Sequence, residues 1–223
     1  MVGFRAAIAP SRSGGAEGNE RLTAMTGAVL LILLLVECYT ILKIGRLLTL
    51  HVFLGMLLLG PVTLKAGSVL YRFTRYYAGS APYRQKGPPA PLLRLIGPII
   101  MLLTACVFGS GIMLAVIGPS YGPPSGWLTV HRISFIAWAF FIAIHVLTYV
   151  WRLPRLLAAE ARGGSVPHDE ADGHAGGGRH ASRAMQVLGG RGTRLALLIA
   201  SLLAGLVIAL LTVHLVGKWE PFS

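Results

Sequence analysis

The chain has 223 residues, of which 54% are hydrophobic and 13% charged, and its mean hydropathy is +0.67. These values lie outside the range of ordinary soluble domains and indicate an integral membrane protein. The net charge of +12 is of the kind that binds nucleic acid, but the arginines gather in connections between apolar segments. Membrane topology accounts for that distribution, so we expect no nucleic-acid partner.

Five apolar segments follow one another along the chain. Residues 1–22 precede them, lack an apolar core and are predicted to be a disordered cytoplasmic N-terminus. Each segment is long enough to cross a hydrocarbon core, which needs about 20 residues. Because lipid offers the backbone no hydrogen-bond partners, each is expected to be an α-helix. The predicted spans are 23–44, 48–71, 93–117, 128–151 and 194–216.

The connection between the fourth and fifth spans divides the chain. It is long, polar and rich in glycine, which predicts a flexible cytoplasmic linker at 153–193. Before it lies a four-helix transmembrane bundle at 23–152, an architecture that can hold a cofactor between facing helices. After it come a fifth transmembrane helix at 194–217 and a short external tail at 218–223. The predicted fold class is an all-α integral membrane protein.

The basic residues predict the orientation of these helices. They concentrate after the second and fourth spans, whereas the connection from Gly118 to Trp127 carries no charge. Under the positive-inside rule the two basic connections are cytoplasmic, which places the N-terminus inside and the C-terminus outside. Lys43 and Arg46, in the first external connection, run against this pattern. The expected location is the inner (plasma) membrane, as a multi-pass protein.

Residues that can bind iron recur at matched positions on the second and fourth spans. Thirteen residues separate His51 from Lys65, and thirteen separate His131 from His145. Fourteen helical steps make nearly four turns, so each pair lies on one helix face, about 21 Å apart along the axis. The two spans run in the same direction, which gives an outer pair, His51 with His131, and an inner pair, Lys65 with His145. This arrangement has room for two stacked haems.

The chemistry of haem asks for these residue types. A low-spin haem iron takes two axial ligands from opposite sides, and neutral imidazole serves well. Gly55 on the second span would allow close approach of a porphyrin, although glycines there also suit close helix packing. The propionates need cations near the membrane surfaces. The candidates are Arg46 and Arg132 outside, with Arg72 and Arg152 inside.

The pattern His131-x13-His145, opposite a helix that begins with His51, resembles the cytochrome b family of quinol-oxidising respiratory complexes. The second and fourth helices of that family hold two b haems. The resemblance covers residues 24–152 and rests on spacing and helix order. It implies one or two haem b groups that carry electrons across the membrane, in the cytochrome subunit of a quinone-linked system. The implied partners are lipid, quinone or a redox protein, and other subunits or further copies of the chain.

Lys65 departs from the family pattern, in which both helices carry a histidine pair. It could extend toward the inner headgroups, or ligate the inner iron as a neutral amine opposite His145. The matched depth and face favour ligation. A third alternative has no inner haem, with Lys65 and His145 along a proton or quinone path. The outer site has an alternative too, because His214 near the end of the fifth span could replace His51 as the partner of His131.

Two other classes of function stay open. A non-haem transporter or channel component would use Glu37, Lys65 and His145, with His131 as a further candidate, to line a polar path. Glu37 could instead be neutralised by Lys43 or Arg46 from the nearby helix end. In a structural membrane anchor the histidines would be incidental. The sequence shows no nucleotide-binding glycine motif and no catalytic triad, so a subunit that transfers electrons is expected rather than a complete enzyme.

Overall fold

The computed structural model describes residues 14–80, 83–84, 91–118, 126–161 and 190–222, and within these ranges it is helical, with no strand. Five helices are long and apolar enough to cross a membrane. The all-α fold with five apolar helices, predicted from the sequence, is thereby confirmed. These helices are α1 (Gly14–Leu42), α2 (Ile44–Tyr77), α4 (Pro91–Ile117), α5 (Gly126–Tyr149) and α8 (Arg191–Thr212).

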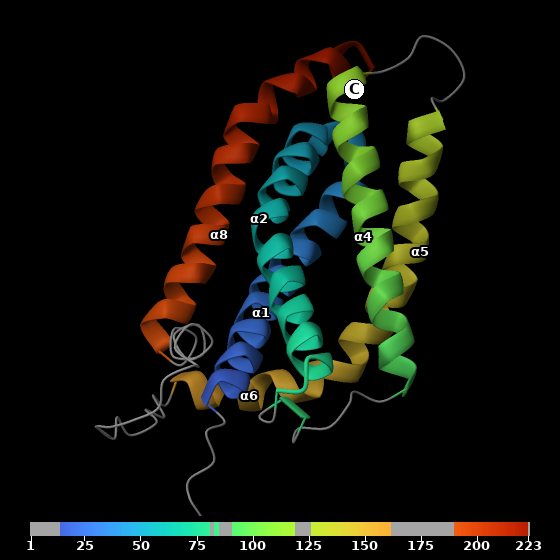
Figure 1. Cartoon of the computed structure of the whole chain (residues 1–223). Helices are drawn as coiled ribbons and strands as arrows, with labels where there is room; N and C mark the ends of the chain where they lie inside the picture. The colour runs from blue at the N-terminus through green and yellow to red at the C-terminus, as the bar shows by residue number, and fades with distance from the viewer. Residues whose placement is uncertain (1–13, 81–82, 85–90, 119–125, 162–189, 223) are drawn as a thin grey trace, which may run out of the picture.

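Three short helices extend the long ones. The 3-10 helix η1 (Val150–Arg152) leads from α5 into α6 (Leu153–Ala161), and η2 (Val213–Phe222) continues α8. Figure 1 shows α6 lying across one end of the bundle, beside the start of α1, which it contacts. The first part of the predicted linker is therefore helical. Its residues 162–189 lie outside the described ranges.

Helix α1 begins earlier than the sequence predicted. Residues 14–22, expected to belong to a disordered segment, form its first turns, while residues 1–13 are outside the described part of the chain. Asn19 and Leu22 are almost fully buried. The side-chain amide of Asn19 donates to the Ser68 carbonyl of α2 at 3.0 Å. Packing against α2 stabilises these turns, although their own composition does not demand a helix.

The helices alternate in direction. In Figure 1, α1, α4 and α8 run one way and α2 and α5 the other. Helix α2 packs against α1 and α8, whereas α5 packs mainly against α4. The indole N–H of Trp138 donates to the Thr104 hydroxyl at 2.9 Å and joins α5 to α4. The bundle thus consists of two packed groups, α1–α2–α8 and α4–α5.

Helices α2 and α8 meet at two glycines. A Cβ atom on Gly60 would overlap the backbone of Ser201, and one on Gly205 would overlap the backbone of Leu57. Glycine at both positions lets the two backbones touch, as in close helix pairs within membranes. Large apolar side chains elsewhere are exposed on all five long helices, as expected of helices that face lipid.

A tight turn joins α1 to α2. Lys43 alone separates the two helices, and the Arg46 amide donates to the Lys43 carbonyl at 2.9 Å. Leu47 has non-helical backbone angles (φ −118°, ψ 20°), so the first turn of α2 bends away from the turn residue. In such a helical hairpin, residues at equal distances from the turn lie at equal depth. The last turns of α1 therefore face the first turns of α2.

Candidate functional site

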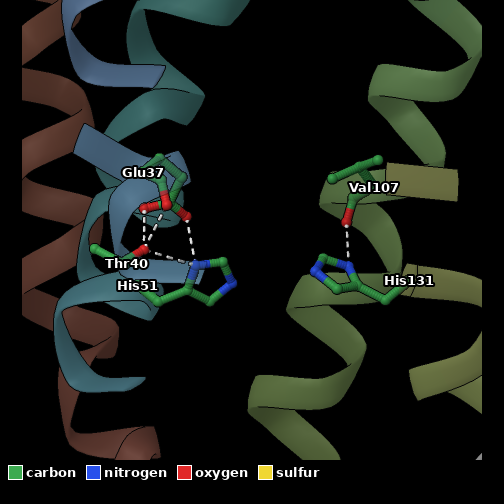
Figure 2. A network of polar contacts seen from close by, with 5 residues as sticks. All are labelled: Glu37, Thr40, His51, Val107 and His131. Carbon is green, nitrogen blue, oxygen red and sulfur yellow. Dashed lines mark hydrogen bonds and ion pairs between the residues drawn. The ribbon is translucent and has the colours of Figure 1, made fainter. Parts of the chain in front are cut away.

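His51 of α2 and His131 of α5 face each other at the end of the bundle that contains the Lys43 turn. Their ring centroids are 6.4 Å apart, and the ring planes are inclined by 78°. Figure 2 shows each ring held from behind by its own group of partners, with its remaining nitrogen directed toward the opposite ring. The outer pair predicted from the sequence is therefore brought together. The two residues come from different packed groups of the bundle.

The His51 ring is held by the last turns of α1. Its Nδ1 lies 2.8 Å from Oε1 of Glu37 and 3.2 Å from the Thr40 hydroxyl. Thr40 also donates to the Glu37 backbone carbonyl at 2.7 Å and lies 3.3 Å from Oε2 of the carboxylate. Glu37 and Thr40 are buried. The partner of Glu37 is thus His51, whereas Lys43 and Arg46, the cations suggested by the sequence, are exposed.

The His131 ring is held by α4. Its Nδ1 lies 3.1 Å from the Val107 carbonyl oxygen and 3.0 Å from the Ser110 hydroxyl. Gly111 makes room for the ring, because a Cβ atom there would lie 3.2 Å from Cε1 of His131. The small residues of α4 that the ring needs were not identified from the sequence. Their signal is the Gly-Ser-Gly run at 109–111, which is unusual in an apolar span.

These contacts define which ring nitrogens are free. A carbonyl oxygen can only accept a hydrogen bond, so Nδ1 of His131 donates to Val107. A carboxylate likewise only accepts, so Nδ1 of His51 donates to Glu37. In its neutral form, each ring then has its lone pair on Nε2. Histidines that bind metals nearly always donate their other ring N–H to a carboxylate or a backbone carbonyl, as both do here.

The spacing of the rings fits two ligands on one metal ion. Metal–imidazole bonds of about 2 Å on each side, with about 1 Å from each nitrogen to its ring centre, place the two centres about 6 Å apart. The observed separation is 6.4 Å. Within the described ranges no group of three or more His, Cys, Asp or Glu residues could hold a metal ion. Two imidazoles suffice for haem, whose porphyrin supplies the other four ligands, but fall short of the three or four protein ligands typical of zinc.

The inner pair differs. Lys65 extends to α1, where its ammonium group donates to the Thr23 carbonyl at 2.6 Å. Gly27 leaves space for it, because a Cβ atom there would lie 2.8 Å from Nζ. The His145 ring packs on Tyr149, with centroids 4.8 Å apart. Among the hydrogen bonds described for these helices, none joins Lys65 to His145.

A polar network between α1 and α2 surrounds Lys65. The Ser68 hydroxyl donates to the Lys65 carbonyl at 2.8 Å and lies 2.9 Å from the Thr23 hydroxyl. Asn19 donates to the Ser68 carbonyl from the same face of α1. This network was not predicted from the sequence, in which Asn19 falls within a segment expected to be disordered. Lys65 is therefore one member of a set of contacts between helices.

The remaining predicted site residues are more dispersed. Gly55 faces α1, since its Cβ position lies 3.8 Å from Oε1 of Glu37. His214 is exposed in η2, and the ring that faces His131 is that of His51. Three of the predicted propionate partners are exposed, whereas the fourth belongs to η1 and its side chain is not described. These four are Arg46, Arg72, Arg132 and Arg152.

A cavity of about 550 Å³ lies between α1, α2 and α8, in the half of α2 that contains Lys65. Its lining is mainly apolar, with Gly60 and Gly67 of α2 and Leu197 of α8 among its residues. Asn19, Ser68 and Tyr71 also line it, but Asn19 and Ser68 are buried and hydrogen-bonded within the protein. Such a lining suits a largely apolar molecule.

Comparison with known proteins gives no relative from which a role could be transferred. No protein-family model, curated protein or solved structure matches the chain. The functional argument therefore depends on the geometry of the His51 and His131 rings and on the groups that hold them.

Proposed function

We propose that this protein is a membrane-embedded b-type cytochrome that holds a haem between His51 and His131. One observation carries the proposal: the two rings face each other at a spacing suited to one metal ion, and each is anchored through Nδ1. A histidine that merely stabilises helix packing needs no free Nε2 aimed at a second histidine. The matched anchoring on two different helices is typical of histidines that bind a metal.

The chain's own residues would prepare the site for electron transfer. A bound haem b would supply a one-electron couple, in which ferric iron accepts one electron and ferrous iron releases it. Glu37 and Val107 fix the two rings through hydrogen bonds. Arg132, next to His131, and Arg46, five residues before His51, are the candidate partners of the propionates.

The proposed orientation places this site near the external face. Arg72, Arg75 and Arg84 lie at the end of α2 away from His51, and Arg155 lies on α6 at that same end of the bundle. Under the positive-inside rule that end is cytoplasmic. A haem held there by His51 and His131 would lie in a position suited to electron transfer to an acceptor at the outer face, from a donor in the membrane or on the cytoplasmic side.

The contact of Lys65 with Thr23 favours one haem per chain over two. A second haem would require the Lys65 amine to leave that carbonyl and lose its proton. Quinone remains the proposed donor, and the cavity between α1, α2 and α8 is the place to test for it. Wild-type protein should then gain thermal stability from a short-chain quinone analogue. Gly67→Phe, which fills the cavity from a position with no atom within 4 Å of its Cβ, should abolish that gain.

Haem analysis of the purified protein tests the proposal. We expect a reduced-minus-oxidised b-type spectrum and one haem per chain by pyridine haemochrome assay. The protein should come from haem-replete cells in a mild detergent. A monodisperse, colourless protein without extractable haem would contradict the proposal and leave the transporter and the structural anchor as alternatives. Two haems per chain would show that a second haem is bound, for which Lys65 and His145 are the candidate ligands.

A further inference from the structure

The two facing histidines are anchored by groups of different charge. His131 donates to a neutral backbone carbonyl, with a hydroxyl beside it. His51 donates to a carboxylate. The Nδ1 to oxygen distance is also shorter at His51, 2.8 Å against 3.1 Å at His131. Hydrogen bonds to an ionised acceptor are shorter and about twice as strong as neutral ones.

The carboxylate of Glu37 is built into the protein and is not a surface group that happens to lie nearby. Glu37 is buried within a membrane-spanning helix. Its two oxygens are engaged separately, Oε1 by His51 and Oε2 by Thr40. The Lys43 turn brings this part of α1 to the depth of His51. A buried carboxylate in lipid is costly, and its retention usually marks function.

A carboxylate behind an axial histidine alters the ligand itself. Attraction of the Nδ1 proton toward Glu37 leaves more electron density on Nε2 of His51 and makes the ring a stronger base. A stronger donor, with a negative charge behind it, stabilises ferric iron more than ferrous iron. Hydrogen bonding around an axial ligand is one of the main means by which proteins change haem potential.

We infer that Glu37 is a positioning residue that acts through His51: it makes His51 the stronger of the two axial donors and lowers the midpoint potential of the haem. This inference rests on the proposed function. It identifies a residue that the sequence pattern did not connect with iron. The two helix groups would then have different roles. The α1–α2–α8 group supplies a histidine bonded to a carboxylate, and the α4–α5 group supplies a histidine bonded to a neutral carbonyl.

Potentiometric titration of the purified, haem-loaded protein tests the role of Glu37. Glu37→Gln keeps the size of the side chain and an oxygen acceptor for Nδ1 but removes the charge. We expect the midpoint potential of the haem-loaded variant to be more positive than that of the wild type. Ser110→Ala is the matched control on the His131 side, and its shift should be smaller.

Thr40→Val distinguishes the effect of the Glu37 charge on the midpoint potential from the effect of any other disturbance of the site. It removes the hydroxyl near both Glu37 and His51 but keeps the carboxylate. A carboxylate without that hydroxyl is a stronger acceptor for His51, so the potential should stay the same or become more negative. A positive shift as large as that of Glu37→Gln would overturn the inference, because any change in the site would then have the same effect.

The remaining outcomes are distinct from failure of the proposed function. Haem-loaded Glu37→Gln with the wild-type potential overturns the inference but leaves the cytochrome in place, whereas wild-type protein without haem overturns both. If Glu37→Gln does not take up haem, low-temperature EPR of the oxidised wild type tests instead whether His51 is a strong donor. Strong donation by His51 predicts a larger ligand-field splitting than in a haem bound by two free imidazoles. An equal splitting overturns the inference.

Discussion

The two halves of this membrane bundle carry similar residues at the same helix positions and use them differently. In one half His51 and His131 converge to a ring separation of 6.4 Å. In the other half, fourteen residues further along each helix, Lys65 donates to the Thr23 carbonyl of α1. It interacts electrostatically with His145, but no described hydrogen bond joins the two. Equal spacing on two helices therefore does not make two equal sites. The third helix, α1, decides the outcome in both halves.

Helix α1 offers different groups at the two depths. Near the Lys43 turn it presents the carboxylate of Glu37, which holds a neighbouring imidazole and leaves Nε2 free. Near its start it presents a backbone carbonyl, which accepts a hydrogen bond from a cation. A charged amine inside a bilayer is stabilised by any such acceptor within reach. The same helix thus leaves Nε2 of His51 without a bond to α1 and engages the amine of Lys65.

The largest expected effect is the loss of haem on removal of either facing histidine. His131→Ala and His51→Ala should each abolish the b-type spectrum, because one axial ligand and its anchoring contacts disappear. Pyridine haemochrome assay of the purified variants measures the effect. His214→Ala is the control and should keep a full complement of haem, since His214 is exposed in η2. Loss of haem in His214→Ala with retention in His51→Ala would show that His214, and not His51, is the partner of His131.

A smaller loss should follow from crowding of the His131 ring. Gly111→Val places a branched side chain where a Cβ atom alone would lie 3.2 Å from Cε1 of His131. Crowding of this kind costs about 1–3 kcal/mol, which corresponds to a haem affinity lower by about 5- to 150-fold. Competition with a haem-binding protein measures the affinity. Gly109→Val, at a position with no atom within 4 Å of its Cβ, should change it little. Equal effects at both positions would mean that Gly111 has no special role.

Changes in the inner half should leave the haem in place. Lys65→Met removes the donor to Thr23 but keeps most of the side-chain volume, and His145→Ala removes the inner imidazole. Each should retain the wild-type haem content. Lys65→Met should also lower the melting temperature by a few degrees, through loss of a buried contact between α1 and α2. A loss of half the haem in either variant would show a second haem at this depth.

The smallest expected effect concerns alkaline pH at the end of α2 that lies away from His51. Burial raises the pKa of Tyr83 to about 12. Since the unfolded phenol ionises near 10, the folded state loses stability as the pH rises from about 10 to 12 and keeps it below that range. Thermal melting of wild type and Tyr83→Phe across this range measures the difference, and the variant should fall less steeply. Identical slopes would exclude Tyr83 as the cause.

Much of this fold follows from the sequence because hydropathy is a local property. Five apolar segments predict five helices, and the alternation of their directions follows from the chain having to cross and return. The start of α1 could not be predicted in the same way. Asn19 and its neighbours are polar, and they become helical through contact with Ser68 of α2, which is 49 positions away. A local pattern contains no information about such a partner.

The candidate site, too, could be predicted from the sequence only in part. The sequence by itself determined the depths of His51, His131, Lys65 and His145, because helical rise and span order fix how far along the membrane each residue lies. Only the tertiary structure decided which of them meet, through the rotation of each helix about its axis and the short turn at Lys43. Hydrogen bonds act over about 3 Å, far less than the uncertainty left by helix order. For this reason helix order alone could not predict that Glu37 is the partner of His51 and that Thr23 is the partner of Lys65.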